Sequence, residues 1–151
     1  MEATARAWAS LDLGALAWNL GQLRRLLPSG CQVMAVVKAD AYGHGALPVA
    51  KALQENSVHA FCVACLEEAV ALRRGGIRGE ILILGYTHPA QFPQLLQYDL
   101  TQAILDLDYA KALAAYGPVK GHLALDTGMH RLGLDAGNHD AIGQIFALPR
   151  L

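Results

Sequence analysis

Short apolar runs recur along the chain at a nearly constant interval, and this rhythm limits the fold more than any other feature of the sequence. The runs are apolar or β-branched almost throughout, as expected of strands that are buried on both faces. Successive runs begin 27, 21, 20 and 21 residues apart, at Val33, Ala60, Ile81, Thr101 and His122. Strands repeated at this interval predict β-α units and a parallel sheet.

The segments between the runs carry apolar residues three and four positions apart, which is the spacing of an amphipathic helix. This pattern predicts helices over residues 48–54, 66–74, 89–97, 107–116 and 141–147, with Asp108 and its neighbours starting the fourth. A leading helix over 13–27 lies outside the rhythm. Asp12 is its expected N-cap, and Pro28 ends it.

Two architectures fit this pattern, an open doubly wound sheet and a closed β/α barrel. The first predicted strand is not followed by Gly-x-Gly-x-x-Gly, which disfavours the dinucleotide-binding form of the open sheet. A complete β/α barrel has eight strands in about 250 residues. The 151 residues hold five predicted strands and end where a sixth would begin, so we expect part of a larger domain.

The composition excludes several classes of function. With 54% hydrophobic and 17% charged residues, the chain is expected to be globular. The net charge of −1, with both signs scattered, offers no basic surface for nucleic acid. No apolar run approaches the roughly 20 residues of a membrane helix, and residues 1–10 lack the layout of a secretory signal. We therefore expect a cytoplasmic protein without a membrane segment that binds no nucleic acid.

Two of the three cysteines, Cys62 and Cys65, have the spacing of a redox pair. They also overlap a predicted buried strand, and buried free cysteines are common in proteins. No second pair of Cys or His residues lies nearby to complete a zinc site. We expect structural cysteines and no metal.

Lys38 directly follows the apolar run of the first predicted strand, whereas Lys51, Lys111 and Lys120 lie in helix or loop contexts. Burial of an ammonium group is costly unless the group is paired, deprotonated or used covalently. A neutral lysine amine forms an imine with a carbonyl, and active sites of β/α barrels lie at the carboxyl ends of the strands. The alternative is a lysine whose aliphatic stem runs along apolar surface while its amine reaches solvent. The position of Lys38 in the sequence does not by itself decide between a reactive amine and a solvated one.

The loop after Lys38 contains a tyrosine and two glycines, Tyr42, Gly43 and Gly45. Glycines let the backbone approach a ligand closely, and a phenol donates well to phosphate oxygens. Tyr42 is therefore a candidate ligand-binding residue, with a rim aromatic as the alternative. His44 is expected in the N-cap region of the next helix.

Two long segments resemble a known family. Residues 34–45, Met-Ala-Val-Val-Lys-Ala-Asp-Ala-Tyr-Gly-His-Gly, are similar to the cofactor-lysine motif of alanine racemases nearly residue for residue. Residues 126–133, Asp-Thr-Gly-Met-His-Arg-Leu-Gly, resemble a second motif of the family, and residues 8–19 and 80–85 add smaller agreements in the same order. Residues 77–87 and 98–102 are similar to the serine/alanine racemases of vancomycin-resistance type.

The resemblance implies an α/β fold, a parallel β/α (TIM-type) barrel that is incomplete in this chain. Residues 1–151 would form the N-terminal part of a barrel that binds pyridoxal phosphate, with a leading helix and about the first five β-α units. The remaining strands and a C-terminal β domain would lie outside the chain.

The resemblance also implies an isomerase, an amino-acid racemase that interconverts L- and D-alanine, or serine, and supplies D-alanine for peptidoglycan precursors. Lys38 would hold pyridoxal 5'-phosphate in a Schiff base and act as the catalytic base on one face of the substrate. Tyr42 would bind the cofactor phosphate. Arg131 would lie near the phenolic oxygen of the cofactor and bind the substrate carboxylate.

The sequence departs from the family at one position and lacks a second base. Ala124 stands where many members carry a lysine, often carbamylated, that orients the arginine. Either a bound anion such as chloride fills the space, or Arg131 is positioned in another way, or the site is less well organised. The opposite face of the substrate needs a tyrosine from the C-terminal domain of a partner subunit, which implies a homodimer for the full-length protein. We expect the 151-residue chain alone not to racemise at an enzyme-like rate.

Three other interpretations remain open at this point. The chain could be a single-domain carrier of pyridoxal phosphate, or a barrel aldolase or dehydratase that uses Lys38 on a keto substrate without that cofactor. It could also be a purely structural domain. The residues of the second motif, Arg131 above all, disfavour the carrier, since a carrier needs no anchor for a substrate carboxylate.

Overall fold

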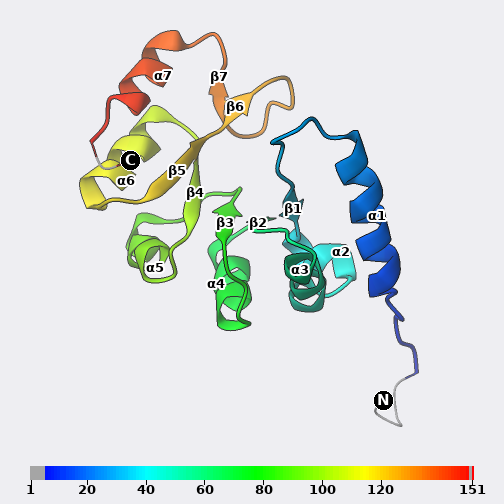
Figure 1. The fold of residues 1–151 in the computed structure, drawn as a ribbon. Coiled ribbons are helices and arrows are strands. Elements are labelled where there is room, and N and C mark those ends of the chain that lie inside the picture. The colour runs from blue at the N-terminus through cyan, green and yellow to red at the C-terminus, as the bar shows by residue number, and fades with distance from the viewer. Residues whose placement is uncertain (1–5, 150) are drawn as a thin grey trace.

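The computed structural model describes residues 6–149 and 151, and a five-stranded parallel sheet forms their centre (Figure 1). The strands lie in chain order: β1 (Met34–Val36), β2 (Ala60–Val63), β3 (Glu80–Ile83), β4 (Thr101–Ile104) and β5 (Lys120–Leu123). A doubly wound sheet reverses its strand order at one point, whereas a β/α barrel adds each strand next to the last. The order therefore confirms part of a parallel β/α barrel.

Helices connect the strands, and all of them except the short one that begins at Lys38 were predicted from the apolar spacing. They are α1 (Leu13–Leu26), α2 (Lys38–Gly43), α3 (Ala46–Glu55), α4 (Leu66–Arg74), α5 (Phe92–Gln97), α6 (Leu107–Tyr116) and α7 (His139–Phe146), with a 3-10 turn η1 (Pro89–Gln91) before α5. Asp12 caps α1, because its carboxylate accepts a hydrogen bond from the Ala15 amide at 2.9 Å. In Figure 1 the connecting helices follow one another along the sheet from α3 to α6.

Three helices, α1, α3 and α7, differ from their predicted bounds by one or two residues at an end. Two further differences have a clear physical cause. The expected single helix over 89–97 is a 3-10 turn followed by α5, because Pro93 has no N–H to donate to the carbonyl of Pro89. The cap of α6 is Asp106 rather than Asp108, since its carboxylate accepts from the Tyr109 amide at 2.7 Å.

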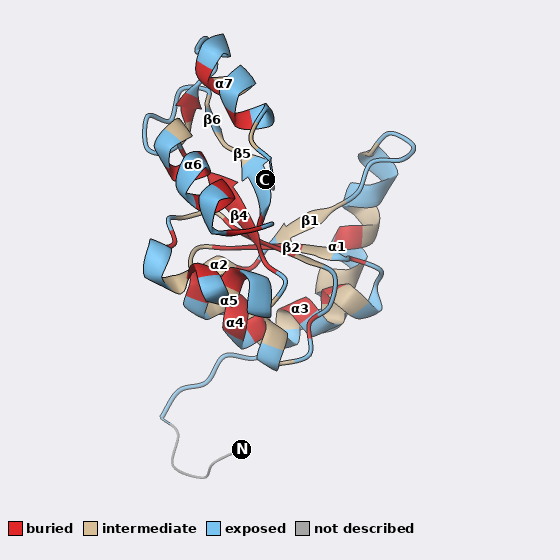
Figure 2. Ribbon diagram, turned by 90° about the vertical axis from the view of Figure 1, so that its left-hand side faces the viewer, coloured by how far each residue is buried: buried red, intermediate tan, exposed pale blue. Residues whose placement is uncertain are grey.

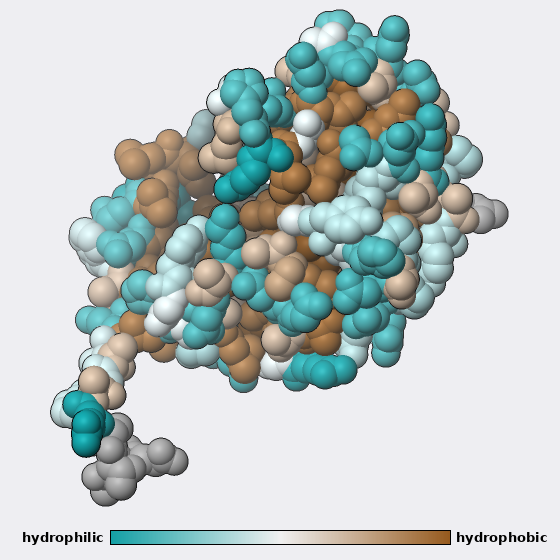
Figure 3. All heavy atoms as spheres, turned by 180° about the vertical axis from the view of Figure 1, so that it is seen from behind, coloured by the Kyte–Doolittle hydropathy of each residue, from teal (hydrophilic) through white to brown (hydrophobic). Residues whose placement is uncertain are grey.

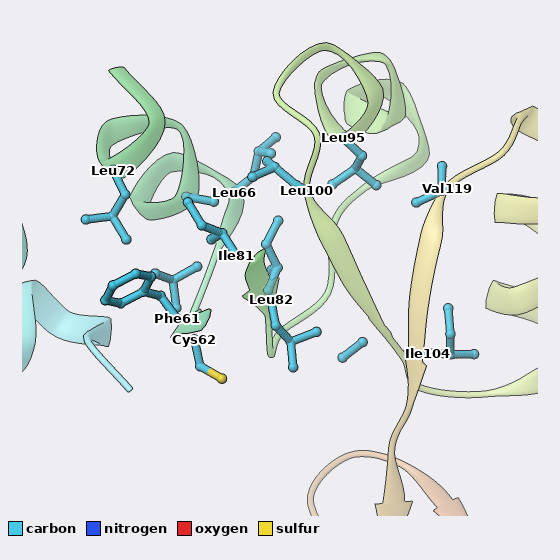
Figure 4. Close-up of a cluster of buried hydrophobic side chains, with 14 of the residues drawn as sticks. Phe61, Cys62, Leu66, Leu72, Ile81, Leu82, Leu95, Leu100, Ile104 and Val119 are labelled. Atoms are coloured by element: carbon cyan, nitrogen blue, oxygen red, sulfur yellow. The ribbon is translucent and has the colours of Figure 1, made fainter. Parts of the chain in front are cut away.

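The hydrophobic core lies between the sheet and the helices. Phe61, Ile81 and Ile104, from three neighbouring strands, are at most 1% exposed and pack in one cluster with Leu72 of α4 and Leu95 of α5 (Figure 4). Burial of each such side chain stabilises the fold by about 1.5–3 kcal/mol. Figure 2 shows buried residues in the central strands and on the helix surfaces that face them.

The two edge strands are not buried on both faces, so that expectation is wrong for β1 and β5. Val36 is 43% exposed, and Lys120 to His122 are exposed, because each edge strand has one neighbour among the described residues. The same exposure explains why β5 begins at Lys120, two residues before the predicted start: a polar residue is tolerated at an open edge. Seen from behind, apolar side chains gather across the middle of the molecule between polar ones (Figure 3).

A small second sheet follows β5 and was not predicted. It pairs β6 (Leu125–Asp126) with β7 (Leu134–Asp135), and α7 then packs against α6. No helix within residues 6–149 is long and apolar enough to cross a membrane.

The cysteines agree with the structural interpretation. Cys62 is buried in β2, Cys65 is the N-cap residue of α4, and both thiols are free. Burial raises the pKa of both thiols, whereas a redox-active thiol depends on a lowered pKa.

Candidate active site

Lys38 and Arg131, far apart in the sequence, line one small pocket at the carboxyl ends of the strands. The pocket has a volume of about 240 Å³, and its other walls are Ala64, Leu84, Gly85 and Leu132. Val37 and Lys38 follow β1, Ala64 directly follows β2, and Leu84 and Gly85 follow β3. Arg131 comes from the loop between β6 and β7. The structure thus brings together the two residues that were assigned to the substrate and the cofactor.

Lys38 is half-buried and Arg131 is exposed. The expectation of a buried lysine is therefore only partly right, because β1 is an edge strand and leaves one side of the lysine open. An amine at a pocket that opens to solvent can meet an incoming carbonyl compound, which a fully enclosed amine could not.

The segment after Lys38 is a left-handed turn rather than the expected loop. Ala39, Asp40, Ala41 and Tyr42 all have φ between 51° and 55°. The left-handed conformation costs about 1–2 kcal/mol for each residue with a side chain, so neighbouring contacts must compensate. Such local strain clusters at functional sites.

Asp40 anchors the far end of this turn. Its carboxylate accepts from the Ala46 amide at 2.6 Å, and its carbonyl accepts from the Gly45 amide at 2.9 Å. His44 lies in the expected N-cap region of α3, directly before the N-cap residue Gly45. Its Nδ1 lies 2.9 Å from the Ala41 carbonyl oxygen, and the side chain that accepts from the first amide of the helix is that of Asp40. The sequence does not indicate this arrangement, because Gly43 and Gly45 suggest only a loop.

Glu68 anchors the near end of the turn and is a site residue that was not predicted. Its two carboxylate oxygens accept hydrogen bonds from the amides of Ala39 and Ala64. The available signal was its place in the first turn of a predicted helix, where a glutamate commonly reaches back to free backbone N–H groups.

Tyr42 does not join Lys38 and Arg131 in the pocket. Its side chain is 61% exposed, and it is the last of the left-handed residues. The structure therefore places the predicted phosphate ligand on the same turn as Lys38 but outside the walls of the pocket.

The loop that carries Arg131 is ordered by Asp126. Asp126 Oδ1 accepts from the amides of Gly128 and His130 at 2.9 and 3.0 Å, and Oδ2 lies 3.0 Å from His130 Nδ1. Hydrogen bonds from the amides of His130 and Gly128 lower the pKa of the Asp126 carboxyl group. The arginine loop thus has a support of its own, although Ala124 offers no side chain that could form a carbamate.

The Gly85 wall of the pocket is fixed by a buried amide. Gln102, in the middle of β4, is fully buried; its Nε2 donates to the Gly85 carbonyl at 2.7 Å, and its Oε1 accepts from Thr87 Oγ1 at 2.7 Å. Tyr109 extends the network by donating from its hydroxyl to the Thr87 carbonyl at 3.0 Å, and burial raises the pKa of Tyr109 to about 12. Gln102 could have been selected from the sequence, because a glutamine inside a predicted buried strand needs hydrogen-bond partners.

Replacing Gln102 with leucine is expected to destabilise the chain by about 2–4 kcal/mol. The change leaves the Thr87 hydroxyl and the Gly85 carbonyl without their partner, and each buried unsatisfied group costs about 1–3 kcal/mol. Urea unfolding measures the loss. Gln144→Leu, at an exposed position of α7, is the matched control, and equal stability of the two variants would contradict this account of the network.

Comparison with known proteins gives a consistent result. Residues 11–151 match the family described as alanine racemase, N-terminal domain. A serine/alanine racemase of Enterococcus gallinarum is 43% identical over 97% of this chain and 21% of its own length. Alanine racemase 1 of Clostridium acetobutylicum is 39% identical over 95% of this chain and 38% of its own length.

Solved structures agree with the fold. An alanine racemase from Clostridium difficile 630, in complex with cycloserine, superimposes with a TM-score of 0.91 at 31% identity, over 99% of this chain and 43% of that one. The chain therefore spans less than half the length of these proteins. Both the sequence resemblance and the partial barrel are confirmed, and the chain belongs to the alanine racemase N-terminal domain family.

Proposed function

We propose that this chain is the lysine-bearing part of a pyridoxal-phosphate-dependent amino-acid racemase. The observation that carries the proposal is the shared pocket, which both Lys38 and Arg131 line at the carboxyl ends of the strands. Catalytic groups of β/α barrels occupy this end. The alternatives of a carrier, an aldolase or a structural domain lose support from the family relationship.

The residues around the pocket fit the cofactor. An aromatic aldehyde that carries a phosphate requires a primary amine, apolar walls for the ring and cationic or donor groups for its charges. Lys38 supplies the amine, the walls are small or apolar at Ala64, Leu84 and Gly85, and Arg131 supplies the charge. A Cβ at Gly85 would lie 2.5 Å from the Ala64 carbonyl oxygen, so the close approach of these two walls requires glycine.

Each residue would have a defined task. When bound, pyridoxal phosphate supplies an electron sink that stabilises negative charge at the α-carbon of an amino acid. Lys38 would hold the cofactor covalently and, once released by the substrate amine, take up or return the α-proton at Nζ. Arg131 would bind the substrate carboxylate through its planar fork of donors, and Tyr42, at the end of the lysine turn, would donate to the phosphate.

Racemisation requires a base on each face of the α-carbon. Among the described residues that line the pocket, Lys38 alone carries a group that can take up a proton at neutral pH, since a guanidinium stays charged. We therefore propose that the second base comes from outside residues 1–151, in a homodimeric whole protein. The 151-residue chain with added pyridoxal phosphate is expected to show no enzyme-like interconversion of L- and D-alanine; chiral chromatography of the mixture measures this, and rapid turnover would refute the assignment of a single base.

Titration with pyridoxal phosphate tests the cofactor proposal. The expected result is a new absorption band of a lysine adduct that saturates at one equivalent per chain. A chain that gives no band would contradict the proposal and favour a structural domain or a lysine that acts directly on a keto substrate. Alanine is the proposed substrate, with serine as the alternative, because relatives of similar identity are named for both.

A further inference from the structure

One carboxylate joins two neighbouring turns at the carboxyl edge of the sheet. Glu68 Oε1 accepts from the Ala39 amide at 2.9 Å, and Oε2 accepts from the Ala64 amide at 2.7 Å. Ala39 directly follows Lys38, and Ala64 is a wall of the pocket that Lys38 lines. The carboxylate of Glu68 therefore spans the turn that presents the lysine and the wall beside it.

The Ala39 amide lies where the backbone passes from negative to positive φ. Val37 has φ of −119°, and Ala39 is the first of four residues in the left-handed region. Left-handed residues with side chains are unfavourable and need compensating contacts. Asp40 supplies such a contact at the far end of the turn, at the Ala46 amide. Glu68 supplies it at the near end, next to Lys38.

The position of Glu68 makes this contact strong. It is half-buried in the first turn of α4, where a negative charge interacts favourably with the helix dipole. Hydrogen bonds to a charged acceptor are about twice as strong as neutral ones, and this carboxylate makes two. The preceding residue, Glu67, is exposed, and its side-chain partner Gln91 lies 3.5 Å away.

We propose that Glu68 is a positioning residue for Lys38: it fastens the left-handed turn to the end of β2 and so holds the lysine amine at the pocket that Arg131 also lines. The lysine's task in this proposal rests on the proposed function. The fastening itself is a property of the two turns and can be measured separately.

Glu68→Gln in the 151-residue chain tests the proposal, with Glu67→Gln as the matched control. Both variants remove one negative charge from the first turn of α4, but the glutamine at position 68 can accept from one amide only and presents its NH₂ to the other. We expect Glu68→Gln to weaken the apparent affinity for pyridoxal phosphate by about tenfold or more, as loss of one charge-assisted hydrogen bond predicts. Glu67→Gln should stay within about twofold of the unmodified chain.

Amide hydrogen exchange supplies a readout that does not depend on the cofactor. In Glu68→Gln we expect exchange at Ala39 and Ala64 to accelerate more than exchange at the amides of β3 and β4, which should change only as far as the urea midpoint of the variant changes. If Glu68→Gln does not fold, Glu68→Asp replaces it, because aspartate keeps the charge but is one methylene too short to span both amides. The expected pattern is the same.

The outcomes separate cleanly. If Glu68→Gln matches Glu67→Gln in both readouts, the proposal is overturned. Faster amide exchange with an unchanged affinity for pyridoxal phosphate would show that the contact is only structural, and would overturn the positioning role. A weaker affinity with unchanged amide exchange would show that Glu68 does not fasten the turn. If the unmodified chain gives no adduct band, the proposed function fails, and exchange at Ala39 and Ala64 still decides whether Glu68 orders the lysine turn.

Discussion

Lys38→Ala is expected to abolish the absorption band that pyridoxal phosphate gives with the unmodified chain. The band arises from a covalent adduct, so removal of the amine eliminates it rather than weakening it. Lys38 lines the pocket, whereas Lys51 lies exposed on α3, and Lys111 and Lys120 interact with Asp108 and Asp99 away from the pocket.

Lys51→Ala is the matched control for this experiment. It removes an amine of the same chemistry from an exposed helix position, so it reports any unspecific reaction of the cofactor with surface lysines. The account requires that Lys51→Ala keep the band at full intensity. A band that survives in Lys38→Ala, or that disappears in Lys51→Ala, would place the adduct elsewhere.

Gly79→Ala is expected to cause the largest loss of stability, about 3 kcal/mol or more. Gly79 has φ of +80°, and a Cβ there would lie 2.1 Å from the His59 carbonyl oxygen. Because the obstacle is backbone, β3 must move away from β2, which breaks the hydrogen bond of 2.8 Å from the Glu80 amide to the same carbonyl. The backbone strain and the loss of this hydrogen bond between the strands both lower the free energy of unfolding.

Gly76→Ala separates the two causes of this loss. Gly76 lies in the same connection between α4 and β3 and has φ of +90°, but a Cβ there meets no atom within 4 Å. This variant should lose only the conformational term of about 1–2 kcal/mol. Urea unfolding of both variants gives the difference, and equal losses would show that the close approach to His59 is not what requires glycine at position 79.

The strands and helices could be predicted because each element has a simple periodic signature. The central runs over 60–64 and 81–84 are apolar, since they are largely buried, and helices such as α4 keep one apolar side. The run over 101–104 is buried as well, although it contains Thr101 and Gln102. The edges were less predictable. An edge strand such as β5 tolerates polar residues, so its start at Lys120 carries no hydrophobic signal.

The position of Lys38 at the carboxyl end of β1 could be predicted because the lysine directly follows an apolar run, whereas Arg131 could be selected only because it lies within a long family motif. The roles of both residues toward cofactor and substrate stay predictions. What the sequence could not show is how their surroundings are held. The left-handed turn after Lys38 reads as a flexible glycine-rich loop, and its order depends on Asp40 and Glu68, whose contacts join residues 6 and 29 positions apart. The sequence does not show the partners of the buried Gln102 amide either, because Gly85 and Thr87 lie in the loop after β3, 17 and 15 positions earlier.

Reduction of the adduct followed by peptide mapping shows which lysine holds the cofactor. The chain is mixed with pyridoxal phosphate, the adduct is fixed with borohydride, and mass spectrometry of the digested protein locates the attached group. The account predicts a single modified residue, Lys38, at one group per chain. A group found mainly on Lys51, Lys111 or Lys120, or spread evenly over the four lysines, would contradict the assignment of this pocket as the cofactor site.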